Sequence, residues 1–274
     1  MNHNEVLQLL SRDLVSAAKT LTPKEARYLV DAYYMIQDNR KIANSQVLAL
    51  SGSEEPHDLI KWLRDQNAVL ENQIKRTLDS WTDTLPSAVW AKSITGIGPV
   101  ISAGLAAHID IAKAPTVGHI WRYAGLLWDK WEKGEKRPWN ASLKVLCWKI
   151  GESFVKFSGN KNDFYGKLYL QRKTQEERYN NEMKFSAQAE EKLKNFNIGK
   201  DKKAYEIYKS GLLPPGHIHA RAKRWTVKLF LSHYKEVSWW LAYNEAPPKP
   251  FTISIMGHGD YIPPPNFTPP AQKK

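Results

Sequence analysis

The sequence predicts a mostly α-helical fold, and three observations lead to that prediction. Apolar residues recur at helical spacing through most of the first 80 residues. Proline stands at candidate helix starts, as in Thr22-Pro23, where its missing N–H would have no partner anyway. Two apolar segments flank the turn Gly96-Ile97-Gly98, a pattern typical of a helix-hairpin-helix motif. We therefore expect a multi-helix protein that contains this motif and ends in an extended, Pro-rich tail.

Residues 1–82 are expected to form a helical scaffold. Residues 4–50 are expected to be helical, with Thr22 placed to cap a helix that starts at Pro23. Residues 51–56 predict a turn, and a second long helix follows over residues 57–81. The apolar positions that support these helices are Val6, Leu9, Leu10, Leu14, Ala17, Tyr28, Leu29, Ala32, Tyr33 and Ile36 in the first, and Leu59, Leu63, Val69, Ile74 and Leu78 in the second.

Residues 83–160 contain the predicted hairpin. Gly96 and Gly98 are expected to supply positive φ angles, and Pro99 to open the second helix of the motif. Backbone N–H groups near this helix end would then face a phosphate, a contact that positions nucleic acid without reading its bases. The alternative is a tight turn between two core helices, because a Gly-x-Gly pattern alone is weak evidence.

The segment 126–140 alternates aromatic and basic residues. Trp128, Trp131 and Trp139 lie among Lys130, Lys133, Lys136 and Arg137, after a helix that Thr116 can cap and Gly125 can end. Such a segment suits a groove in which bases stack and phosphates are neutralised. The alternative is that the tryptophans belong to the core and the cations coat it.

Three regions complete the chain. Residues 161–210 are rich in charge and predict an exposed helical arm. Residues 211–245 predict a long helix whose basic side chains share one narrow strip, while residues 246–274 form the Pro-rich tail. The strip consists of His217, Arg221, Arg224, Lys228 and Lys235. It suits phosphate tracking, although a single solvated face would have the same pattern.

The charge of +12 is unevenly placed along the 274 residues. Residues 1–80 carry 10 Lys and Arg against 11 Asp and Glu, and residues 81–274 carry 30 against 17. A polyanion is therefore the expected partner, with a merely solubilising surface as the alternative. The lone Cys147 excludes an internal disulfide and is expected to be buried.

No metal, cofactor or membrane segment is expected from the sequence. His217, His219, His233 and His258 lack the spacing of a metal site. The longest uncharged run, residues 93–109, is interrupted by glycines and a proline. We expect a cytoplasmic protein that is associated with nucleic acid.

The order GIGPVISAGLAAHID, TVGHIWRYAGLLW and NASLKVLCWKI resembles the C-terminal domain of the bridge-RNA-guided insertion-sequence transposases over residues 59–157. The resemblance implies that Gly96 and Gly98 belong to a hairpin that contacts nucleic acid and that Tyr123 and Gly125 belong to the family's Tyr-Ala-Gly-Leu helix. It implies that Asn140 and Leu143 start the next helix. It also implies a catalytic serine after the Tyr-Ala-Gly-Leu helix. This sequence has no serine between Tyr123 and Asn140, and its first 80 residues do not resemble the family's RuvC-like domain.

The sequence therefore favours a non-catalytic protein that binds DNA, or structured RNA, and that forms homo-oligomers. One alternative is an active transposase that uses Ser142, or an acid such as Asp129, Glu132 or Asp163 with a metal. Another is a structural adaptor that binds an acidic protein. The residues expected to bind DNA are Lys92, Thr95, Gly96, Ile97, Gly98, Val100, Arg122, Lys136, Arg137, Arg221, Arg224 and Lys228.

Overall fold

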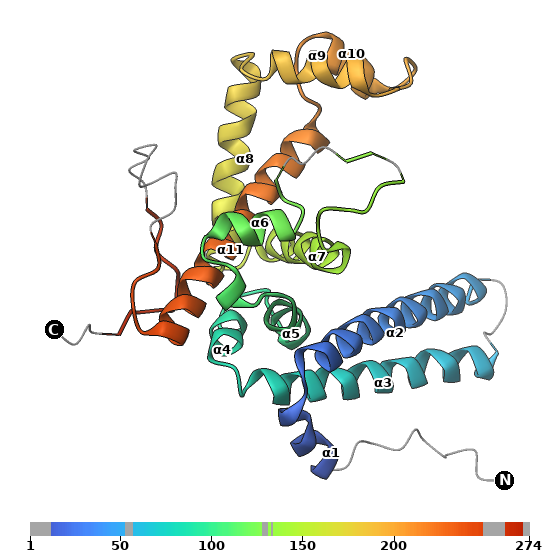
Figure 1. Cartoon of the computed structure of the whole chain (residues 1–274). Helices are drawn as coiled ribbons and strands as arrows, with labels where there is room; N and C mark the ends of the chain where they lie inside the picture. Colours follow the sequence, from blue (N-terminus) through green and yellow to red (C-terminus); the bar gives the residue numbers. More distant parts are fainter. Residues whose placement is uncertain (1–11, 53–56, 128–130, 133, 249–260, 271–274) are drawn as a thin grey trace.

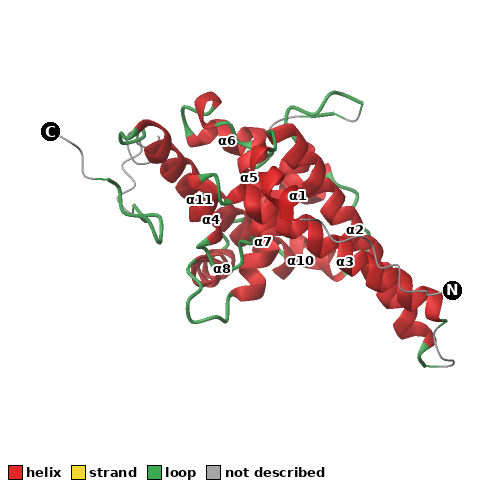
Figure 2. Cartoon of the chain, turned by 90° about the horizontal axis from the view of Figure 1, so that it is seen from below, coloured by secondary structure: helices red, strands yellow, loops and turns green. Residues whose placement is uncertain are grey.

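This computed structural model describes residues 12–52, 57–127, 131–132, 134–248 and 261–270. Within them lie eleven α-helices and no strand, so the expectation of a mostly α-helical fold is confirmed (Figure 2). No helix of this part of the chain is long and apolar enough to cross a membrane. The expected helical positions Val6, Leu9 and Leu10, and the tail residues 249–260, lie outside the described residues.

The N-terminal region is a long helical hairpin made of α2 (Pro23–Leu50) and α3 (Asp58–Thr82). The Thr22 hydroxyl accepts from the Glu25 N–H at 3.3 Å, and the Glu25 carboxylate accepts from the Thr22 N–H at 2.7 Å. This capping box fixes the start of α2 where the sequence predicted it. Before it, α1 (Arg12–Ala17) and η1 (Ala18–Thr20) form separate elements, because the extended backbone of Leu21 interrupts the helix.

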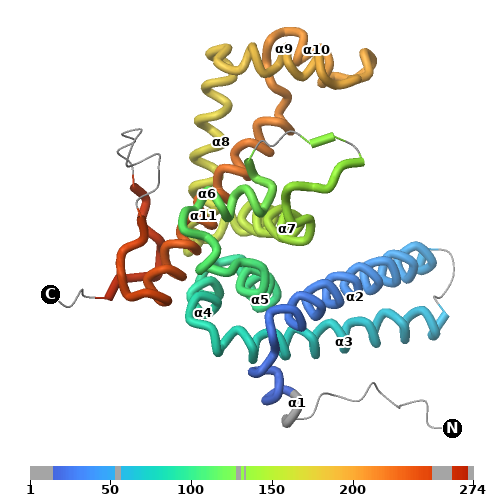
Figure 3. Tube along the Cα trace, viewed as in Figure 1, coloured from blue at the N-terminus to red at the C-terminus, as the bar shows by residue number. Residues whose placement is uncertain are grey.

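Between the two long helices lies a buried polar cluster. The carboxylate of Glu71 on α3 accepts hydrogen bonds from Tyr33, Gln37 and Arg40 on α2, at 3.0, 3.0 and 2.6 Å. Burial of the carboxylate opposes ionisation, but these three donors outweigh it and lower the pKa of Glu71. The hairpin is therefore joined near its middle by a charged cluster, and its far end extends away from the rest of the molecule (Figures 1 and 3).

At its base the hairpin packs on α5 (Pro99–His108), which follows α4 (Pro86–Lys92). An apolar cluster joins Val30, Leu78 and Trp81 of the hairpin to Val100 and Ala103 of α5. The sequence predicted the two helices around the Gly96 turn, and both are present. Their apolar faces are used in packing, which places the turn between them at the surface of the core.

The main core surrounds α11 (Pro215–Tyr243). α7 (Ala141–Phe157) and α8 (Tyr165–Asn181) pack against α11 through three rings. The ring of Phe154 stacks on Tyr165 at 4.8 Å, and both meet Phe230 edge-on at 5.4 and 5.2 Å. The short elements η2 (Ile111–Lys113) and α6 (Val117–Tyr123) lie on the same core.

The prediction that residues 161–210 form an exposed arm is wrong for its first half. α8 packs along α11 because its apolar positions, although few, include the large side chains of Tyr165 and Tyr169, which are buried. Glu176 of α8 is buried as well. Only α9 (Ser186–Asn195) and α10 (Lys203–Lys209) project at the far end of α8, above the start of α11 (Figure 1).

The described part of the tail, residues 261–270, lies against α11 and α4. The His233 ring donates from Nε2 to the Ile262 carbonyl at 2.8 Å, so its Nδ1 accepts from the Tyr165 hydroxyl at 2.7 Å. Trp90 Nε1 donates to the Pro265 carbonyl at 2.8 Å, and Asn266 donates to the Ser93 carbonyl at 3.0 Å. One buried imidazole therefore joins α8, α11 and the tail.

We expect the stability of the protein to fall as the pH drops through the titration of His233. Burial lowers the pKa of His233 to about 4, whereas an unfolded histidine has a pKa near 6.5. The unfolded state therefore takes up the proton first, and stability is lost between about pH 6.5 and pH 4. From pH 7 to pH 5 the free energy of unfolding should fall by roughly 1–2 kcal/mol through this group.

Urea denaturation at both pH values measures this loss. In His233→Gln the amide keeps a donor and an acceptor but does not titrate, so the pH-dependent loss should shrink by that amount. The exposed His119→Gln is the matched control and should keep the full loss. Equal losses in the wild type and His233→Gln would contradict the assignment.

Candidate nucleic-acid interface

A cleft of about 700 Å³ opens between α7, α11 and the chain that follows α6. Its lining combines indole rings with basic side chains and contains no carboxylate among the described residues. The lining residues are Gly125, Leu126, Leu127, Trp139, Lys144, Cys147, Trp148, Ala220, Lys223, Arg224, Val227 and Lys228. An electropositive, aromatic cleft is suited to a negatively charged, ring-bearing ligand.

One wall of the cleft depends on Gly125. This residue ends α6 with a φ of +64°, and a Cβ there would meet Trp139 at 2.9 Å and Lys144 at 3.0 Å. Asn140 then caps α7 by accepting from the Leu143 N–H at 2.8 Å. Its amide also donates to the Tyr123 hydroxyl at 3.0 Å. The residues that carried the family resemblance after the hairpin thus meet at the edge of this cleft.

The opposite wall depends on a close approach between α7 and α11. Gly151 of α7 leaves room for the aliphatic part of Lys223, which a Cβ would meet at 2.6 Å. The ammonium group of Lys223 then pairs with Glu152 and lies 5.6 Å from the Trp148 ring. Lys223 is therefore neutralised locally and mainly shapes the cleft.

The remaining cations of the cleft are Lys144, Arg224 and Lys228, and they repel one another and the neighbouring Arg137. Burial lowers the pKa of Lys144, and the positive charges of Arg224 and Arg137 lower it further. Burial and Arg224 lower the pKa of Lys228 in the same way. None of the four has an ion pair in the described part of the chain. A bound anion would relieve this repulsion, so the cluster favours anionic ligands.

Aromatic rings hold these cations in place. The Lys144 ammonium group lies 4.1 Å from the Trp139 ring, and the Arg137 guanidinium lies 5.7 Å from the Trp131 ring. Trp131 and Trp139 meet edge-on at 5.8 Å. Trp128, Lys130 and Lys133 of the predicted aromatic and basic segment lie outside the described residues. In its described part, the segment 126–140 therefore builds an aromatic edge for the cleft.

The turn between α4 and α5 lies at the other end of α7. Gly96 has a φ of +89°, as predicted, and its carbonyl accepts from Ser153 on α7 at 2.6 Å. A Cβ at Gly96 would lie 2.8 Å from the same hydroxyl oxygen. Thr95 donates to the Asn162 carbonyl at 3.3 Å. The turn is thus fastened to α7 and to the chain after it.

The prediction of a positive φ at Gly98 is wrong. Its φ of −98° and ψ of −178° are extended, because it occupies the N-cap position of α5. No atom lies within 4 Å of a Cβ placed on Gly98, and α5 has no side-chain cap. Ile97 and Val100 are buried, so their side chains serve the core. The open side of Gly98 leaves the start of α5 accessible to a ligand.

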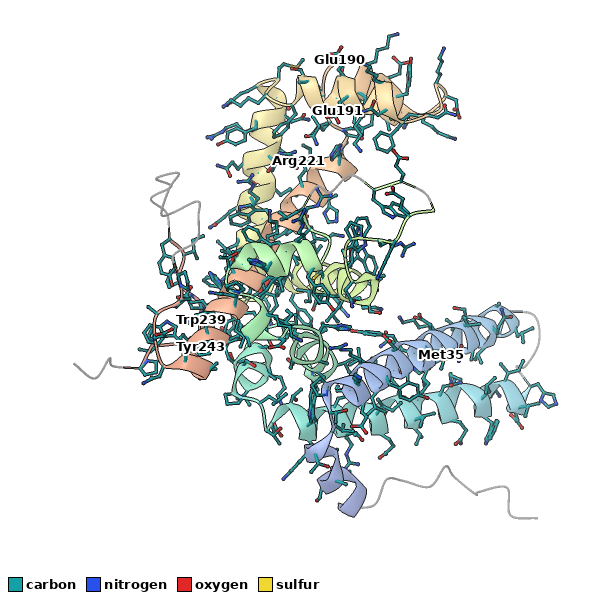
Figure 4. All side chains as sticks on the ribbon, viewed as in Figure 1. Met35, Glu190, Glu191, Arg221, Trp239 and Tyr243 are labelled. Carbon is teal, nitrogen blue, oxygen red and sulfur yellow. The ribbon has the colours of Figure 1, made fainter. Side chains whose placement is uncertain are left out.

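Several predicted contact residues are engaged elsewhere. Lys92 pairs with Asp79 and Asp83 at 2.6 and 2.5 Å. Arg221 pairs with Glu176 at 2.7 Å and lies over the Phe185 ring, at the junction of α11 and α9 (Figure 4). Arg122 is exposed and has a partner of its own. Lys136 is exposed and does not line the cleft.

The expected basic strip on α11 does not form as one solvated face. Lys235 is buried against Trp239, where burial lowers its pKa to about 8. His217 bonds the Tyr208 hydroxyl. With Arg221 also paired, only Arg224 and Lys228 of the strip line the cleft, because packing within the fold takes up the other three.

No catalytic constellation assembles around the candidates from the sequence. Ser142 is exposed on the first turn of α7, and it has no hydrogen bond to a base within the described chain. Asp163 is buried at the start of α8, away from other acids, while Glu132 is exposed and Asp129 lies outside the described residues. No group of three metal-binding side chains occurs among the described residues. His258 also lies outside them.

Sequence reasoning missed Lys144, Trp148 and Lys223 as members of the cleft. Lys144 and Trp148 are four residues apart, so they share one face of α7. This spacing could have predicted that the two side chains lie together. The sequence did not predict which element packs beside that face, because α11 comes some 75 residues later in the chain.

Comparisons with known proteins give no match: no protein family, no curated protein and no solved structure matches this chain.

We expect Gly125→Ala to destabilise the protein more than Gly134→Ala. Both glycines have positive φ, +64° and +103°, so each substitution strains the backbone. Only at Gly125 does the new methyl group meet packed atoms, those of Trp139 and Lys144. Overpacking of this kind costs roughly 1–3 kcal/mol.

Urea denaturation of the two variants measures the difference, and the wild type gives the reference. Gly134→Ala shares the backbone strain but lacks the contact of the new methyl group with packed atoms. The difference between the two variants therefore isolates the packing of Trp139 against the end of α6. Equal destabilisation would contradict the arrangement of this wall of the cleft.

Proposed function

We propose that the protein binds nucleic acid, with DNA as the first choice and structured RNA as the second, through the cleft between α7 and α11. The observation that carries the proposal is the cluster of Arg137, Lys144, Arg224 and Lys228, in which burial and then the charge of Arg224 lower the pKa of both lysines. Cations held together without carboxylates are typical of phosphate-binding surfaces.

The aromatic lining supports a ligand with bases that are free to stack. Trp139 and Trp148 lie among the cations of the cleft. Base stacking on tryptophan contributes about 1–3 kcal/mol per base and does not depend on sequence. A single strand or a distorted duplex therefore suits the cleft better than a regular duplex, whose bases are already stacked on one another.

We also propose that α4, the Gly96 turn and α5 act as a helix-hairpin-helix that holds a second stretch of the phosphate backbone. The open N-terminus of α5 at Gly98 supports this role. Lys144 and Ser153 mark the two sites along α7, and nine residues of helix separate them by about 14 Å. That span equals about four nucleotide steps of one strand at 3.4 Å each.

The resemblance to the C-terminal domain of the bridge-RNA-guided transposases agrees with this proposal. Tyr123, Gly125 and Asn140, which the resemblance marks, border the cleft. The role we propose is binding and positioning, since what converges at the cleft is cations and indole rings.

Neutralising two cations of the cleft should weaken binding on every sequence to a similar degree. We expect Lys144→Gln/Arg224→Gln to reduce the slope of log affinity against log salt by about 1.5, since each phosphate contact contributes about 0.7–0.9. Fluorescence anisotropy with labelled single-stranded DNA, duplex DNA and structured RNA across a salt series measures both effects.

Lys75→Gln/Arg76→Gln is the matched control for this experiment. It removes the same charge from exposed positions on α3, in the near-neutral hairpin. If this control lost as much affinity as the cleft variant, the effect would come from net charge alone. Absence of binding by the wild type to all three ligands would reject the proposed function and favour an acidic protein partner.

Charge at Gly98 tests the hairpin separately from the cleft. Gly98→Glu places a carboxylate at the open start of α5, and we expect it to weaken binding about fivefold relative to Gly98→Gln. Gly98→Gln has nearly the same shape and fills the same open space, so it controls for bulk. Equal affinities of the two variants for single-stranded and duplex DNA would reject a phosphate contact at this turn.

A further inference from the structure

An exposed seam runs along α2, and no other helix of the described chain covers it. The α2 seam consists of Tyr28, Ala32, Met35, Asn39, Ile42, Gln46 and Ala49, which follow one another at alternating intervals of four and three residues. This is the spacing of positions a and d in a coiled coil. Tyr28, Met35 and Ile42 are 73, 62 and 62% exposed.

The other sides of α2 already have partners within the chain. Tyr33, Gln37 and Arg40 face Glu71 on α3. Tyr34 faces α7, whose Lys149 ammonium group lies 3.7 Å from its ring. The seam occupies the remaining side of α2. Met35, one of its residues, lies near the middle of this helix (Figure 4).

We propose that a second copy of this chain covers the α2 seam and forms a parallel, in-register, two-helix coiled coil. In a parallel pair each a residue meets its own copy, and so does each d residue. Tyr28, Met35 and Ile42 then meet apolar partners, and Asn39 meets Asn39, so that the two amides can bond each other. In an antiparallel pair a meets d, which would set Asn39 against Met35 or Ile42 and leave a buried amide without a partner.

Charge favours a second copy at this place. Residues 1–80 carry 10 basic and 11 acidic side chains, whereas residues 81–274 carry 30 and 17. The surfaces that meet along the hairpin are therefore near neutral, so pairing brings no excess of like charge into the contact. Asn39, a polar a position in the middle of the seam, is the kind of residue that sets register and pair number in coiled coils, and Gln46 is a second polar a position one heptad later.

A hollow at the N-terminal end of the seam also fits a second copy. It measures about 430 Å³ and lies beside Tyr28, between Leu21, Lys24, Glu25 and Leu29. In the parallel, in-register pair, the Tyr28 ring of the partner falls at this end of the seam. An aromatic ring over the hollow would remove its apolar wall from water.

The oligomeric state of the full chain tests the proposal. Sedimentation equilibrium at high salt, where any bound nucleic acid is released, should show a dimer at micromolar concentration. Met35→Asp should weaken dimerisation by roughly 30-fold or more, as expected for a central interface position. Leu48→Asp is the matched control: Leu48 is 67% exposed on the same helix but lies off the seam, so its dimer should persist.

Cysteine cross-linking tests the register. The native Cys147 is buried, and burial raises the pKa of its thiol to about 12, so an introduced cysteine would be the reactive one. Ile42→Cys should form a disulfide-linked dimer under mild oxidation, and Leu48→Cys should not. A monomeric wild type, or equal effects of Met35→Asp and Leu48→Asp, would overturn the proposal. A dimer in which Ile42→Cys fails to cross-link would overturn the parallel register.

Discussion

The contact between α7 and α11 is the constraint on which the rest of this structure depends. Phe154, Tyr165 and Phe230 interlock α7, α8 and α11, and Gly151 lets α7 approach α11 closely enough for Lys223 to lie across it. One face of this helix pair is core and another is the wall of the basic cleft. The cations of the cleft are therefore positioned by apolar packing beneath them, and they keep their places although they repel one another.

The same helix connects the two surfaces that we assign to nucleic acid. Its N-terminal half carries Lys144 and Trp148 to the cleft, and its C-terminal half carries Ser153 to the Gly96 turn. Because a helix is rigid over this distance, the two surfaces keep a fixed separation. A ligand that reaches both would be recognised by the spacing of its phosphates, without any reading of its bases. The helical hairpin at residues 23–82 packs on α5 at its base, and its near-neutral charge distinguishes it from the basic cleft.

Residues of one chemical type have different roles in this structure because they differ in burial. Lys235 and Lys228 are both on α11, yet Lys235 is enclosed by the core and Lys228 reaches the cleft over the Trp121 ring. His233 is neutral and buried, and it holds the tail in place, whereas His119 is exposed. Some cations of the chain thus serve its structure, as Lys92 and Arg221 do with their carboxylate partners, whereas those at the cleft other than Lys223 lack acidic partners in the described chain.

The sequence by itself determined the local structure of this protein. Capping at Thr22, the prolines at 23, 86 and 99, and the positive φ of Gly96 and Gly125 are decided within one or two helical turns, so helix starts and turns could be predicted from nearby residues. Only the tertiary structure decided which charges remain available, because Lys92 and Arg221 meet carboxylates of neighbouring helices and Lys235 is buried in the packed core. The cleft could not be predicted for the same reason, because its two walls are far apart in the chain. Helical periodicity indicates which face of a helix is buried, but it does not indicate which element packs on that face.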